Sequence, residues 1–152
     1  MLSKVKSASI LGIDAYEVEV ETDMTFGIPG FSIVGLPDVS VKESKDRVKS
    51  AITNSMIEFP PNQKITLNLS PADRKKEGPS FDLPIAIGIL AACGTLNTAK
   101  LESYMITGEL SLDGSINSVK GALSMSLLAK NLGYKGIIVP FANADEAAVV
   151  EG

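Results

Sequence analysis

The sequence contains no histidine and no tryptophan, and its single cysteine is Cys93. Without histidine, the most common catalytic base and metal ligand is missing, which excludes a Ser-His-Asp triad, a Cys-His pair and a typical zinc site. One cysteine cannot form an internal disulfide bond. The sequence also lacks an apolar run of about 18 residues and the apolar core of a signal peptide. We therefore expect a cytoplasmic protein that has no membrane partner.

The chain has fewer basic than acidic residues. Fourteen Lys and Arg residues stand against eighteen Asp and Glu residues, which gives a formal net charge of −4. This balance excludes a protein that is basic over its whole surface, although it leaves room for a local basic patch.

What is present suits one globular domain. The chain has 152 residues, of which 45% are hydrophobic, and this length buries enough surface to fold without disulfides or metals. Polar and apolar residues alternate on both sides of Gly12–Asp14, which predicts an antiparallel hairpin. Helical periodicity begins at Val41, and Ser40 with Glu43 forms a capping box at that helix start.

The rest of the chain mixes strands and helices irregularly, which predicts an α+β fold with a mixed sheet. Asp82 is the expected N-cap of a buried apolar helix. The final helical pattern stops soon after it begins, so we expect residues 1–152 to be one domain of a longer protein. Further strands are predicted over 31–35, 64–69, 104–112, 116–119 and 137–139, and further helices over 83–96, over 121–132 and from 143 onward.

The segment Asp73–Pro84 combines a charged loop, a Gly-Pro turn and Ser80 just before the buried helix. Backbone N–H groups at a helix start stabilise negative charge, so Ser80 suits a nucleophile or an anion ligand. A purely structural role as a helix cap is the alternative. A nucleophilic serine in this chain needs lysine or a carboxylate as its base.

Two families share motifs with this sequence. The segments Glu77–Ser80 and Thr107–Ile116 resemble the nucleophile segment and the Thr-Gly-Glu strand of the Lon protease domain. A more extensive resemblance, in order along nearly the whole chain, is to the N-terminal domain of the ComM/YifB family of Mg-chelatase-like AAA+ ATPases. The segments that carry this second resemblance are Phe31–Pro37, Val41–Ile52, Asn68–Asp73 and Phe81–Ala86.

The resemblance implies a ribosomal protein S5 domain 2-like (Lon protease-like) fold and a non-catalytic accessory role. In the family, an AAA+ module after this domain assembles into rings, expected to be hexameric, and drives branch migration of DNA in recombination or transformation. ATP and Mg²⁺ are expected in that missing module. Residues 1–152 contain no Walker A loop, so they should bind no ATP in the Walker manner, and no metal site is predicted in them.

The alternative function is a Lon-type Ser-Lys peptidase or amidase. Leu123 stands where the protease has its lysine, and Lys120 lies three residues earlier. This offset moves a side chain by nearly a helical turn. Phe81 also follows Ser80 where the protease has a small residue, and Asp82 places a carboxylate nearby, which disfavours an oxyanion. The candidate dyad for this alternative is Ser80 with Lys120.

Two basic clusters are candidates for contact with DNA or another partner. Lys42, Lys45 and Lys49 share one stripe of the first helix, a spacing that suits phosphate contacts. The second cluster, Arg74–Lys76, lies in the predicted exposed loop near Ser80. Ordinary solvated charges are the alternative interpretation, because carboxylates interrupt both clusters.

The sequence places no aromatic residue beside either cluster, so we expect weak, sequence-independent contacts to the DNA backbone. A third hypothesis is an architectural domain that controls ring assembly. The sequence does not separate it from DNA binding.

Overall fold

Two long strands joined by a tight turn form the centre of the protein. The computed structural model describes all residues, 1–152. β1 (Leu2–Leu11) pairs antiparallel with β2 (Asp14–Phe26), and Leu11 lies opposite Asp14 at the turn. Gly12 occupies the turn with a φ of 66°, a left-handed conformation in which a side chain would be strained. The predicted hairpin is confirmed.

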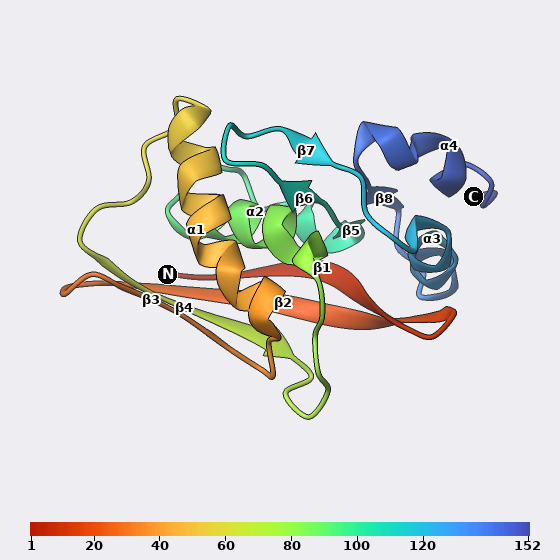
Figure 1. Ribbon diagram of the computed structural model, residues 1–152, viewed down its shortest axis with the longest axis horizontal. Helices are drawn as coiled ribbons and strands as arrows, with labels where there is room; N and C mark the ends of the chain where they lie inside the picture. The colour runs from red at the N-terminus through yellow and green to blue at the C-terminus, as the bar shows by residue number, and fades with distance from the viewer.

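Four further strands extend the hairpin into a six-stranded sheet of order β3-β4-β2-β1-β5-β8 (Figure 1). The β2–β4 pair is antiparallel, whereas β3–β4, β1–β5 and β5–β8 are parallel. The predicted α+β fold with a mixed sheet is therefore confirmed. The remaining elements are β3 (Gly30–Val34), α1 (Val39–Asn54), β4 (Gln63–Ser70), α2 (Asp82–Ala92), β5 (Tyr104–Ile106), β6 (Glu109–Leu110), β7 (Ile116–Asn117), α3 (Ala122–Asn131), β8 (Gly136–Ile138) and α4 (Ala144–Ala147), with short 3₁₀ turns at Pro79–Phe81, Leu101–Ser103 and Phe141–Asn143.

The main hydrophobic core lies between the sheet and the pair α1 and α2, which Figure 1 shows on one side of the sheet. Alternate residues of β2, such as Val18 and Val20, point into this core and are fully buried. Gly88 allows α2 to approach the sheet closely, because a side chain there would lie 2.6 Å from Thr22 Oγ1. Ser3 Oγ also donates a hydrogen bond of 2.7 Å to the Gly88 carbonyl.

A buried ion pair joins α1 to α2. Arg47 Nε donates to Asp82 Oδ2 at 2.7 Å, and Arg47 Nη2 donates to Oδ1 at 3.1 Å. The Asp82 carboxylate is completely buried and also accepts from Ser44 Oγ at 2.5 Å and from the Leu110 N–H at 3.0 Å. Its hydrogen bonds to Arg47 raise the pKa of that guanidinium above its usual value. This pair sets the position of α1 relative to the rest of the domain.

The opposite face of the sheet carries α3 and a second, smaller core. Ala8, Met105, Met125 and Ala129 are its buried members. No helix in the structure is long and apolar enough to cross a membrane.

Beside this small core, the glutamates of β2 are half-buried rather than fully solvated. Lys6 makes ion pairs with Glu17 and Glu19, and Tyr134 donates a hydrogen bond of 2.8 Å to Glu17. Burial opposes the ammonium form of Lys6, yet the bond to Glu19 raises its pKa. Burial and the Glu17 carboxylate raise the pKa of Tyr134.

Both predicted N-caps were wrong. The helix α1 begins two residues before Val41, and its cap is Asp38, whose side chain accepts from the Val41 N–H at 2.8 Å. The Asp82 side chain makes no capping bond, because Arg47 and Ser44 hold it. At α1 a local residue upstream of the predicted cap performs the role, whereas at α2 residues of another helix bind the predicted capping carboxylate.

Several predicted element bounds also change. The helix predicted over 83–96 ends at Ala92. The strand predicted over 104–112 divides into β5 and β6 because the backbone of Gly108 leaves the sheet and bonds to the Ser80 carbonyl and the Leu83 N–H, both at 3.0 Å. β8 is a half-buried edge strand rather than a buried one.

Candidate nucleic-acid interface

The lysine stripe of α1 lies on the surface with its charges unpaired. Burial of Val41 and Val48 fixes the rotation of α1, which turns Lys42 and Lys49 to solvent and leaves Lys45 half-buried. Four ion pairs occur in the structure, and none includes a stripe lysine. The three ammonium groups are therefore available to an anionic ligand.

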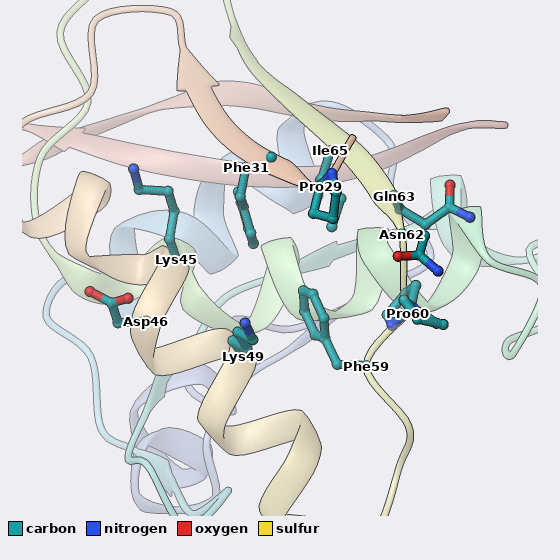
Figure 2. Close-up of a pocket in the computed structure, with 12 residues that line it drawn as sticks. Pro29, Phe31, Lys45, Asp46, Lys49, Phe59, Pro60, Asn62, Gln63 and Ile65 are labelled. Carbon is teal, nitrogen blue, oxygen red and sulfur yellow. The ribbon is translucent and has the colours of Figure 1, made fainter. Parts of the chain in front are cut away.

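A groove of about 590 Å³ lies beside the stripe. Lys45, Asp46 and Lys49 of α1 form one wall, as Figure 2 shows. The start of β3 and the loop that precedes β4 form the other walls. The remaining lining residues are Pro29, Gly30, Phe31, Phe59, Pro60, Pro61, Asn62, Gln63 and Ile65.

Two phenylalanine rings lie in this groove beside the lysines. Phe31 and Phe59 stack with their centroids 6.4 Å apart and their planes inclined by 17°. Lys49 Nζ lies 5.8 Å from the centroid of the Phe59 ring, within the range of a cation–π contact. The expectation that no aromatic residue flanks the stripe was wrong. The parallel pairing of β3 with β4 brings Phe31 next to the loop that contains Phe59, a contact that sequence spacing does not reveal.

The far wall of the groove presents two side-chain amides that make no hydrogen bond within the protein, those of Asn62 and Gln63. The backbone around them is fixed: the Asn62 carbonyl accepts from the Gly27 N–H at 2.9 Å. Pro60 and Pro61 restrict the preceding backbone through their rings. The groove therefore combines unpaired cations, aromatic faces and free amides on a restrained frame.

The second basic cluster retains two of its three predicted members on the surface. Arg74 lies over the Tyr16 ring, 4.9 Å from its centroid, and the Tyr16 hydroxyl donates to the Lys75 carbonyl at 2.7 Å. Lys75 pairs with Glu77 at 3.8 Å, and both side chains are largely exposed, so the contact contributes little to stability. Arg74 and Lys75 are thus exposed on the loop between β4 and α2.

Lys76 does not belong to that surface, and its assignment as a DNA contact was wrong. Its side chain is completely buried, and Nζ donates to the carbonyls of Gly35 at 2.7 Å and of Pro71. Its backbone also bonds to Leu36 and Asp38, both at 2.9 Å. Burial lowers the pKa of Lys76 from 10.5. The loops before α1 and before α2 close around this lysine and remove it from solvent.

Ser80 and Lys120 line a separate cavity of about 610 Å³, together with the carboxylates of Asp38, Glu77 and Glu109. No hydrogen bond joins the Ser80 hydroxyl to the Lys120 ammonium group. Three carboxylates around a serine oppose the developing negative charge of an acyl-transfer reaction. Chemically, the cavity is better suited to a cationic or neutral group than to an oxyanion.

Leu123, at the position of the protease lysine, is 37% exposed in the first turn of α3, and its N–H donates to Glu146 at 3.2 Å. No cluster of three or more Cys, Asp or Glu side chains is arranged to hold a metal ion.

The fold is that of a Lon-like α+β domain. The chain is 29% identical over 123 residues to Lon protease of Leptospira interrogans, covering 80% of this chain and 14% of that protein. Residues 20–143 match the family model described as Subunit ChlI of Mg-chelatase. The chain belongs to this Mg-chelatase-like family, as its motifs predicted.

Two relatives from this family match almost all of the chain. YifB of Escherichia coli is 47% identical over 151 residues, which cover 99% of this chain and 29% of YifB. Competence protein ComM of Haemophilus influenzae is 42% identical over 149 residues, which cover 98% of this chain and 29% of ComM. The chain thus spans less than a third of the length of these curated relatives.

Proposed function

We propose that this domain is a DNA-binding accessory domain of a Mg-chelatase-like ATPase and that it serves DNA processing such as recombination or transformation. The observation that carries the proposal is the row of unpaired lysines on α1 beside an open groove. The family membership and the name of the competence protein relative support the same role.

The spacing of the stripe suits a nucleic-acid backbone. From Lys42 to Lys49 the helix rises about 10 Å, which corresponds to about three phosphate steps along one strand of a duplex. Neutralising three phosphates gives a slope of log affinity against log salt of about −2.7 for a duplex and about −2.1 for a single strand. Binding by this domain alone is therefore weak, independent of sequence and strongly reduced by salt.

The test is a titration of labelled DNA with residues 1–152 at low salt. The triple variant Lys42→Glu, Lys45→Glu, Lys49→Glu should lose at least tenfold in affinity. The matched control reverses three exposed lysines elsewhere, Lys100, Lys130 and Lys135, and so changes the net charge equally. Equal losses in both triple variants, or no loss in the first, would contradict the proposal.

In this proposal, ATP and Mg²⁺ act in a separate ATPase module, and the ring of self-associating subunits, expected to be hexameric, holds this domain near the DNA. Residues 1–152 contain no Walker A loop. At matched ionic strength and free Mg²⁺, adding ATP to residues 1–152 should therefore leave their affinity for DNA unchanged. A change in affinity would place a nucleotide site within this domain.

The second candidate, a Ser-Lys peptidase or amidase, rests only on the fact that Ser80 and Lys120 line the same cavity, whose carboxylates oppose that chemistry. The test is labelling with a serine-directed electrophile. A covalent adduct that disappears in both Ser80→Ala and Lys120→Ala would establish this activity. The absence of an adduct at Ser80 would remove the candidate.

A further inference from the structure

We propose that Phe31 and Phe59 form a stacking platform for an unpaired base, so that the groove prefers single-stranded to duplex DNA. This inference rests on the proposed function and adds the form of DNA that the groove selects.

The geometry of the two rings suits this role. Their near-parallel planes, inclined by 17°, form a short offset stack that an additional flat ring can extend. Both side chains are half-buried and pack against the main core, which holds the rings in place. Each ring nevertheless lines the open groove, so part of each ring is accessible to a ligand.

The surroundings of the platform match the parts of a nucleotide. Lys45 and Lys49 stand on the α1 side of the rings, where they can neutralise the phosphates that flank a stacked base (Figure 2). On the other side, the free amides of Asn62 and Gln63 offer donors and acceptors to the edge of a base. Asp46 brings one negative charge into the groove, which keeps the phosphate contacts weak.

A duplex satisfies only part of this arrangement. Its phosphates are accessible to the lysine stripe, but its bases are stacked on one another and do not expose their faces. An unpaired base has a free face and can stack on an aromatic side chain whatever its identity. The platform therefore adds affinity for a single strand alone, whereas the lysines act on both forms.

The variant Phe59→Leu tests the platform because it keeps an apolar side chain against the core and removes the aromatic face. Affinity for single-stranded oligothymidine should fall by about 5- to 150-fold, the range found for base–aromatic stacking. Affinity for a duplex of equal length should stay unchanged. Circular dichroism and the melting temperature check that the variant is folded.

Two further variants separate stacking from packing. Phe59→Trp retains a stacking face and should preserve the affinity for the single strand. Because the natural sequence has no tryptophan, the indole of this variant is also the sole tryptophan fluorophore. Its emission should be quenched by oligothymidine and not by the duplex. The variant Ile13→Leu alters an exposed apolar residue outside the groove and is the control.

The outcomes distinguish the two proposals. If the wild-type chain binds neither form of DNA, the proposed function fails. If the chain binds both forms through the lysines but Phe59→Leu leaves single-strand affinity unchanged, only the stacking platform is refuted. An equal loss toward single strand and duplex in a folded Phe59→Leu variant would also refute it.

Discussion

The ion pair between Arg47 and Asp82 should be the most sensitive polar contact in the domain. The variant Arg47→Met removes the guanidinium and keeps an apolar stem of similar length. The Asp82 carboxylate then stays completely buried without a counter-charge, and only Ser44 Oγ and the Leu110 N–H still donate to it. Removing one partner of a buried pair costs about 3–5 kcal/mol.

This loss is large against the stability of a domain of this kind, which is about 5–15 kcal/mol. The Arg47 side chain is 21% exposed and Asp82 is fully buried, so solvent screens the pair only on one side. We therefore expect Arg47→Met to lower the free energy of unfolding by about 3 kcal/mol, the lower end of the range for a buried pair.

Urea unfolding followed by circular dichroism measures this change. The double variant Arg47→Met, Asp82→Leu removes both charges and should be more stable than Arg47→Met alone, because no unpaired charge is left in the core. The exposed change Lys42→Met on the same helix is the control. A loss below about 1 kcal/mol in Arg47→Met, typical of an exposed pair, would refute the reasoning.

Four other substitutions have expected outcomes. Gly88→Ala should lower the free energy of unfolding by about 1–3 kcal/mol, because its methyl group would collide with Thr22 Oγ1. Thr22→Val should raise the free energy of unfolding, because it removes a buried hydroxyl that has no partner. Urea unfolding measures both changes, and a destabilised Thr22→Val would contradict this account. Asp46→Asn removes the negative charge from the groove and should strengthen binding to single-stranded and duplex DNA alike by at least twofold in a titration. Glu43→Asn is the control for net charge. Unequal effects of Asp46→Asn on the two forms of DNA would contradict this prediction. Burial lowers the pKa of Lys76 from 10.5, so the unfolded chain binds this proton more tightly, and Lys76 should make stability rise as the pH approaches 10.5 from below, against the opposite contributions of Lys6 and Tyr134. Lys76→Met should remove this contribution in urea titrations across that pH range, and the exposed change Lys100→Met should not. A pH dependence that is unchanged in Lys76→Met would oppose the assignment.

Local patterns predicted most of the elements. Alternation along β1 and β2 indicated the hairpin, because each residue's neighbours on the partner strand follow directly from the turn. The spacing of Val41, Ser44 and Val48 predicted the buried face of α1, since a helix repeats every 3.6 residues or so. With the shared motifs, this was enough to predict the fold class and the family.

Local patterns failed where a distant partner competed. Asp82 matches a helix cap by position, yet Arg47 from another helix binds its carboxylate. Residues 104–112 alternate like one strand, yet the segment around Ser80 draws Gly108 out of the sheet. Neither outcome follows from the neighbouring sequence, because each depends on the packing of α2 against other elements.

The candidate site divides in the same way. The sequence by itself determined the lysine stripe, because Lys42, Lys45 and Lys49 share one helix and its geometry sets their relation. Only the tertiary structure decided that Lys76 is buried between two loops and that Phe31 and Phe59 meet beside Lys49. The physical reason is that helix periodicity is local, whereas burial and side-chain contact depend on which strands pair.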